Sequence, residues 1–296
     1  MGRGDLTADE WARLKPHLHK TGQRGGRWTS HRRVIDGIPF RERTGVPWRD
    51  LPARFGPWKT IYERHRHWSA DGTWDRILAA VLADSDADAD GRIDWSMVSV
   101  DSTSCRAHQH AAGARKTPPR VPGKRRTPRQ HQPDEGLGRS RGGMTCKIHL
   151  VGVGGRRALA FLLAPGPWGG GRPTAHPVME RVRVTRQDGG RPRTRPDHLA
   201  GDKAYSSGRN RRCLRRRQIK HTIPEPKDQR ANRKRRGSQG GRPTSFDKTI
   251  YKRRNEVERT INALRNSRAV ATRYDTRAYI FHGTVTVAAI RLWLRP

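Results

Sequence analysis

The residues best suited to chemistry are three acids in the basic part of the chain. Asp101 and Asp202 each end a predicted strand, and only 13 acids occur after residue 100. Carboxylates at the ends of neighbouring strands can hold Mg²⁺, and a third carboxylate from a helix would complete the site. Two such ions can clamp the attacking and leaving oxygens of a phosphodiester. Taken singly, the same residues could merely cap turns or pair with arginines.

The third acid, Glu258, lies on a helix predicted over 247–266. Polar residues spaced by three or four positions form one stripe along it, since about 100° separates successive residues. These residues are Tyr251, Arg254, Glu258, Asn262 and Arg265. The alternative is a solvated face, in which an exposed Arg254–Glu258 pair contributes only about 0.3–0.5 kcal/mol.

The elements that must position these acids read as a mixed α/β domain. Apolar alternation predicts a strand from Ile93 that ends at Asp101, and a hairpin turns at Gly154-Gly155. Further strands are expected at 198–202 and 221–224, and helices at 177–185, at 206–217 and near the C-terminus. Residues 113–143 read as a basic excursion, and residues 227–242 as a low-complexity basic segment.

Residues 6–83 read as a small helical module. Thr7 and Glu10 have capping-box spacing ahead of Trp11 and Leu14. Three more helices are predicted around Ile35, Trp68 and Leu78, separated by Gly/Pro turns. Such a module suits a helix-turn-helix reader of DNA. It is equally compatible with a plain helical bundle used for oligomerisation.

The acidic run at 84–91 resembles a calcium loop, but Met97 stands where an EF-hand needs a bidentate Glu. We interpret it as an acidic linker that ends a helical domain of residues 1–92. A catalytic domain of residues 93–296 follows.

Charge points to a polyanionic partner. The 296 residues carry a net charge of +36: 17 basic and 14 acidic residues lie in 1–100, and the remaining 46 and 13 lie in 101–296. No apolar run is long enough to span a membrane or to form a signal peptide, and three scattered cysteines predict neither disulfides nor zinc. We expect a reducing cytoplasm. Four arginines of the predicted 206–217 helix share a face suited to phosphates: Arg211, Arg212, Arg215 and Arg216.

Several motifs together resemble one family. They are Arg43-Thr-Gly-Val-Pro-Trp-Arg-Asp-Leu-Pro52, Val100-Asp-Ser-Thr103 with Arg106-Ala-His-Gln-His-Ala-Ala112, Lys147-Ile-His149, Gly201-Asp-Lys-Ala-Tyr-Ser206 and Tyr251-Lys-Arg-Arg-Asn-Glu-Val-Glu-Arg259. As a set they resemble the DDE transposases of bacterial insertion sequences, in the branch related to insertion sequence five. The glycine-rich 169–172 departs from the family pattern, and Arg265 replaces a usual lysine.

The resemblance implies an RNase H-like mixed sheet flanked by helices, in which Asp101, Asp202 and Glu258 bind Mg²⁺ or Mn²⁺. Tyr251, Arg254 and Arg265 would position phosphates, Asn262 would also face DNA, and His108 and His110 would lie near DNA or the active site. The implied partners are double-stranded DNA at element ends and target sites, and further copies of the chain assembled on DNA in the nucleoid.

We therefore expect a DNA transposase that cleaves element ends and transfers the strands. The rival interpretation is a catalytically inactive or repurposed protein that binds DNA through charge. The enzymatic interpretation requires that the three carboxylates lie close enough to chelate the same ions.

Overall fold

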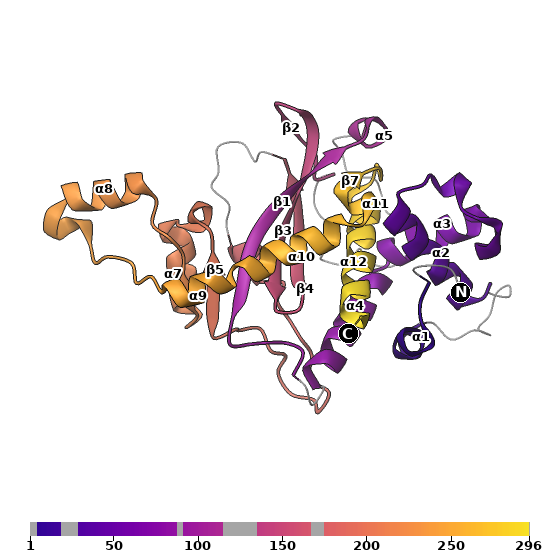
Figure 1. The fold of residues 1–296 in the computed structure, drawn as a ribbon, viewed down its shortest axis with the longest axis horizontal. Coiled ribbons are helices and arrows are strands. Elements are labelled where there is room, and N and C mark those ends of the chain that lie inside the picture. The colour runs from indigo at the N-terminus through magenta and orange to yellow at the C-terminus, as the bar shows by residue number, and fades with distance from the viewer. Residues whose placement is uncertain (1–4, 19–28, 88–90, 115–134, 167–174, 296) are drawn as a thin grey trace.

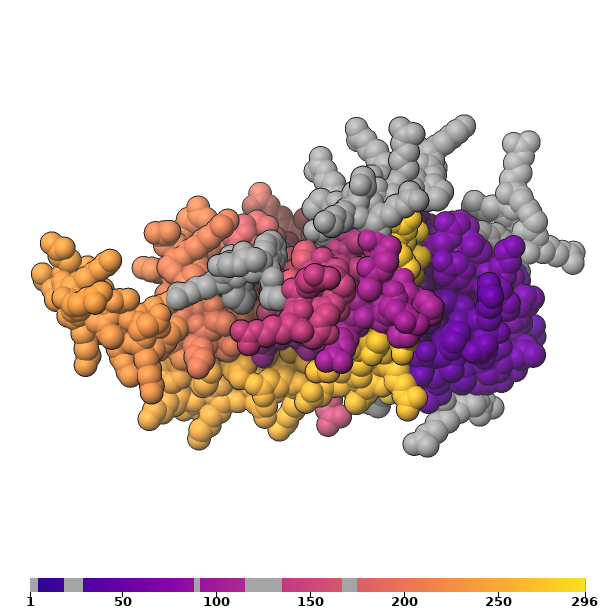
Figure 2. Space-filling view, turned by 90° about the horizontal axis from the view of Figure 1, so that it is seen from above, coloured from indigo at the N-terminus to yellow at the C-terminus, as the bar shows by residue number. Residues whose placement is uncertain are grey.

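The computed structural model describes residues 5–18, 29–87, 91–114, 135–166 and 175–295. The molecule is elongated, with helices of the N-terminal module at one end and α8 at the other (Figures 1 and 2). The glycine-rich 169–172 and most of the expected excursion at 113–143 lie outside the described residues. No helix among the described residues has both the length and the apolar character needed to cross a bilayer.

The predicted helical module is confirmed in its elements. Its helices are α1 (Ala8–Leu14), α2 (His31–Thr44), α3 (Trp58–Ala70) and α4 (Thr73–Ala87). The Thr7 hydroxyl accepts from the Glu10 amide, and the Glu10 carboxylate accepts from the Thr7 amide, so the capping box forms. Residues 84–87 belong to α4, which corrects the prediction of a linker starting at residue 84.

The centre of the molecule is one seven-stranded mixed sheet with the order β2-β3-β1-β5-β6, in which β4 also pairs with β3 and β7 with β1. Its strands are β1 (Val98–Ala107), β2 (Gly138–Ser140), β3 (Gly143–Val153), β4 (Arg157–Pro165), β5 (His198–Gly201), β6 (Lys220–Thr222) and β7 (Thr272–Arg273). β1 runs antiparallel to β3 and parallel to β5. The predicted hairpin and the two later strands are confirmed.

The first strand differs from its prediction. β1 begins only at Val98, because Asp94 accepts from the Ser96 amide and hydroxyl and closes a turn there. It then continues past Asp101 to Ala107, paired with β3 as far as Arg106. Asp101 therefore lies inside β1. The strand that ends beside Asp101 is β5, because its last residue pair with β1 is Gly201 with Val100.

The helices after β1 are α5 (Gln109–Ala112), α6 (His176–Met179), α7 (Gly208–Arg216), α8 (Lys227–Arg235), α9 (Lys248–Arg253), α10 (Asn255–Arg265), α11 (Arg268–Ala271) and α12 (Ala278–Leu294), and all but the projecting α8 flank the sheet (Figure 1). The helix expected at 177–185 is only the short α6. The low-complexity segment contains the helix α8. The helix expected over 247–266 is divided at Arg254, where 3₁₀-type bonds from the Arg254 and Val257 amides interrupt the α pattern.

The C-terminal helix joins the two predicted domains. α12 is apolar on all sides, as expected of a fully buried helix, and packs against α2, α3, α4 and β4. Its Arg291 donates to Glu42 of α2 at 2.8 Å, both side chains being buried. One continuous apolar cluster therefore runs from the N-terminal helices to the sheet.

Candidate active site

Adjacent strands bring the first two acids together. Val100 of β1 is in parallel register with Gly201, the last residue of β5, so Asp101 on β1 and Asp202 just beyond β5 come next to each other where strands lie about 4.8 Å apart. In-register residues of parallel strands point to the same face of a sheet. Asp202 also accepts from the Ala204 amide at 3.0 Å, which fixes its carboxylate at the start of the next turn.

The third acid reaches this face through α10, which crosses β1 and β3 (Figure 1). The α9–α10 junction places Arg254 between two carboxylates. Its guanidinium donates to Asp101 Oδ2 at 3.0 Å and to Glu258 Oε1. The Asp101 side chain is 19% exposed and that of Arg254 17%, so this ion pair is shielded from water. Asp101 and Glu258 are thus within reach of one guanidinium.

Electrostatics connect all three acids. Burial raises the pKa of Asp101, and the nearby charges of Asp202 and Glu258 raise it further. The Ser102 amide and the Arg254 guanidinium act against this shift. The negative charges repel one another at this edge of the sheet, and an added cation would relieve that repulsion.

The donor set fits a hard divalent cation, although it is not assembled as a chelate. Among the residues that the structure describes, no three His, Cys, Asp or Glu side chains form a ready metal-binding group. Arg254 supplies the positive charge between Asp101 and Glu258, and joint chelation by the three carboxylates stays a prediction. Mg²⁺ needs only one or two carboxylates when water and substrate phosphates complete its octahedron. The three acids therefore fit a divalent cation by the chemistry of their oxygen ligands and by their proximity.

A buried layer beneath the acids was not expected as part of the site. The Tyr205 hydroxyl lies 3.5 Å from His149 Nδ1, and His149 is the Cα partner of Ser102 in the β1–β3 ladder. Burial lowers the pKa of His149 to about 4, so the imidazole is neutral at neutral pH. Both residues belong to motifs quoted above, Lys147-Ile-His149 and Gly201–Ser206. That membership was the only signal in the sequence.

The remaining residues of the helical stripe face outward. Tyr251 is half-buried, with the Arg254 guanidinium 5.6 Å from its ring centre. Asn262 and Arg265 are exposed on α10. Their contact with phosphates stays a prediction.

The arginines of α7 divide into two groups. Arg212, Arg215 and Arg216 are exposed and, together with Arg209, line a hollow of about 520 Å³. Arg211 differs, because it is buried and donates to Ser206 Oγ at 2.8 Å and to the Ile223 carbonyl at 2.9 Å. Its place on a shared phosphate-binding face is therefore corrected. Arg211 supports the turn that carries Asp202.

The two histidines beyond β1 lie away from the acids. The His108 ring packs against Tyr274 at 5.0 Å between ring centres, and the His108 side chain accepts from the His110 amide at 3.4 Å. Both line a second hollow, together with residues of the 43–52 motif.

Comparison with known families agrees with this geometry. Residues 96–293 match the family described as "Transposase DDE domain", and residues 6–78 match one described as "Putative transposase of IS4/5 family". The first match covers most of the chain. The chain belongs to the DDE transposases.

Two relatives match part of this chain. An insertion element IS402 protein of 16.2 kDa from Burkholderia cepacia is 40% identical over 126 residues, which are 40% of this chain and 84% of the relative. An uncharacterized protein of Sinorhizobium fredii is 37% identical over 113 residues, 38% of this chain and 83% of the relative. The mixed sheet with flanking helices is the RNase H-like fold expected of a DDE transposase.

Proposed function

We propose that this transposase cleaves the ends of its own element and joins them to target DNA in two metal-dependent phosphoryl transfers. In the first, a water oxygen forms a bond to phosphorus and the 3′ oxygen leaves as a hydroxyl. In the second, that hydroxyl forms a bond to a target phosphorus and displaces the target's 3′ oxygen. The observation that carries the proposal is that Arg254 bonds both Asp101 and Glu258, while the β1–β5 register sets Asp202 beside Asp101.

In this proposal Asp101, Asp202 and Glu258 hold the metal ions. Bound Mg²⁺ or Mn²⁺ would supply Lewis-acid activation of the phosphodiester and of the attacking water. Arg254 pairs with two of the carboxylates, and it would contact a phosphate when DNA and metal replace that pairing. The N-terminal helices would read element ends, and the basic second part of the chain would supply affinity that is independent of sequence.

The test compares Asp101→Asn and Glu258→Gln with Glu256→Gln, a carboxylate on the same helix that contacts Arg253 instead. The substrate is a duplex copied from the DNA that flanks the reading frame, where inverted repeats are expected. We expect the first two variants to lose Mg²⁺-dependent cleavage while binding DNA within a few fold of wild type. Glu256→Gln should cleave normally. Full cleavage by both Asp101→Asn and Glu258→Gln would reject the proposal and leave a DNA-binding protein without this active site.

A further inference from the structure

A second hollow, of about 930 Å³, lies where the N-terminal helices meet the end of β1 and the chain before α12. Three separate stretches line it: 41–62, 108–110 and 274–280. Its size is within the range of about 300–1,000 Å³ that is typical of sites for small ligands and cofactors. Neither the three acids nor the α7 arginines belong to it.

The lining of this hollow is aromatic. Half-buried rings from all three stretches face it: Trp48, Trp58, Tyr62, His108 and Tyr274. Trp48 and Tyr62 meet edge to face at 5.5 Å between ring centres, the Arg41 guanidinium lies 4.8 Å from the Trp48 ring centre, and His108 packs beside Tyr274. Aromatic side chains that present a ring face to bound DNA are the usual platforms for unpaired nucleobases.

The charge around the hollow favours a nucleotide over a neutral aromatic ligand. Arg49 is exposed at the hollow, with its guanidinium 5.6 Å from the ring centre of Trp58. The one acid of the lining, Asp275, is buried and already accepts from Arg41 and Thr284. A phosphate therefore meets a cation at the rim and no exposed carboxylate in the lining.

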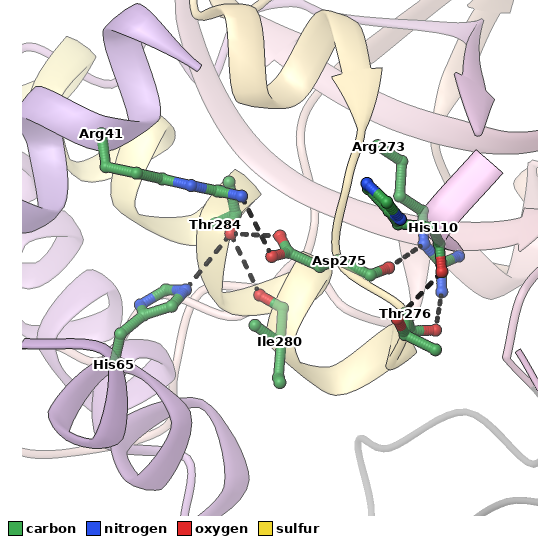
Figure 3. A network of polar contacts seen from close by, with 8 residues as sticks. All are labelled: Arg41, His65, His110, Arg273, Asp275, Thr276, Ile280 and Thr284. Atoms are coloured by element: carbon green, nitrogen blue, oxygen red, sulfur yellow. Dashed lines mark hydrogen bonds and ion pairs between the residues drawn. The ribbon is translucent and has the colours of Figure 1, made fainter. Parts of the chain in front are cut away.

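A network of polar contacts holds the walls in place (Figure 3). Asp275 accepts from Arg41 of α2 at 3.4 Å and from Thr284 of α12 at 2.9 Å. The Thr276 hydroxyl donates to the His110 carbonyl at 3.2 Å, which ties the chain before α12 to α5, the short helix that follows β1. The hollow is therefore preformed, and a ligand would not have to order its walls.

The strand sets the distance from the hollow to the acids. His108 lies seven residues beyond Asp101 along an extended chain, which corresponds to about 23 Å at 3.3 Å per residue. A duplex advances 3.4 Å per base pair, so a duplex bound along β1 would have about seven base-pair steps between the hollow and the acids.

We propose that this hollow captures one unpaired nucleobase of the bound DNA, about seven nucleotides from the phosphodiester at the three acids. The base would stack between rings of Trp58 and Tyr274, and its phosphate would lie near Arg49. The inference rests on the proposed function for its DNA substrate and for the position of the cleaved bond.

The experiment measures binding in EDTA, so that no cleavage occurs. The probe is a short duplex with one extrahelical 2-aminopurine, whose fluorescence falls when it stacks on aromatic rings. Three control DNAs accompany this probe. A duplex with an abasic bulge has the same bend without the base, and the other two are a fully paired duplex and a single strand that carries 2-aminopurine. We expect quenching with the bulged probe, and binding at least about fivefold tighter than to the abasic bulge, as stacking of one base predicts.

Trp58→Leu and Tyr274→Leu should each reduce that preference to within about twofold while binding the paired duplex as wild type does. Trp11→Leu is the matched control, because Trp11 is a half-buried tryptophan of α1 beneath Arg32 that lies outside the hollow. It should keep the full preference. Thermal melting checks that each variant is folded.

Quenching of the single strand as well as the bulged duplex supports capture of an unpaired base from either source. Quenching of the bulged duplex alone supports capture from a duplex. Equal affinity of wild type for the 2-aminopurine and abasic bulges would overturn the inference, whichever variants fold. Asp101→Asn should retain base capture, so failure of the cleavage proposal and failure of this one are separately visible.

Discussion

A buried histidine at the joint between the N-terminal helices and α12 should make stability depend on pH. His65 of α3 is 1% exposed. Trp74 Nε1 donates to its Nδ1 at 3.2 Å, so its Nε2 carries the hydrogen and donates to Thr284 Oγ1 at 3.2 Å. A second proton would have to lie on Nδ1, against the Trp74 N–H. The neutral ring is therefore the form that the fold accommodates.

The structure also sets the size of the effect. Burial lowers the pKa of His65 to about 4, with the nearby charge of Arg41 in the same direction and that of Asp275 opposed. In the unfolded chain this histidine titrates near 6.5, so protons bind the unfolded state first as the pH falls. The contribution of His65 is complete above pH 6.5 and is lost as the pH falls towards 4. The loss of stability amounts to about 2 kcal/mol by pH 5 and reaches about 3 kcal/mol at low pH.

Urea unfolding followed by tryptophan fluorescence, at about pH 7 and about pH 5, measures this loss. Wild type should lose about 2 kcal/mol more between the two pH values than His65→Gln does. His67→Gln is the matched control, since His67 is exposed on the same helix, and it should behave as wild type. Equal pH dependence of wild type and His65→Gln would refute the assignment of a buried neutral imidazole.

Three further outcomes are expected. Arg291→Met should lower the free energy of unfolding by about 3–5 kcal/mol, because it leaves Glu42 buried without its partner charge. Adding Glu42→Leu to the same chain should restore most of that loss. A double variant that is no more stable than Arg291→Met in urea unfolding would contradict this. Gly45→Ala should lower the free energy of unfolding by about 1–2 kcal/mol, because φ is +71° and the new Cβ would lie 2.9 Å from Arg268 Cβ; an unchanged melting temperature would count against it. Arg212→Gln with Arg215→Gln should reduce the slope of log affinity for duplex DNA against log salt by about 2, and an unchanged slope would place these cations away from DNA.

Local patterns were enough to predict most of the elements. The capping box at Thr7, the apolar spacing of α2, α3 and α4 and the glycine pair of the hairpin each act over a few residues, so the sequence displays them directly. Asp101 and Asp202 were recognisable for a similar reason, because a carboxylate at the end of an apolar strand stands out in a strongly basic chain. Glu258 was recognisable from the polar stripe of its helix and from the family motif.

Long-range pairing decided the details of the site. β1 continues past Asp101 because β3, more than 40 residues later, supplies hydrogen-bond partners as far as Arg106. Spacing on α7 could not separate Arg211 from its neighbours, because its burial depends on Ser206 and on the Ile223 carbonyl beyond the helix. Contacts between distant segments leave no periodic trace in the sequence.

The sequence by itself determined which residues are available for phosphate and metal chemistry and which helices and hairpin form, since residue type and local periodicity are sufficient for both. Only the tertiary structure decided that one guanidinium lies between Asp101 and Glu258, and that three remote stretches enclose an aromatic hollow. Both arrangements arise where separate elements pack together. Their free energy comes from burial and charge compensation between groups that are far apart along the chain.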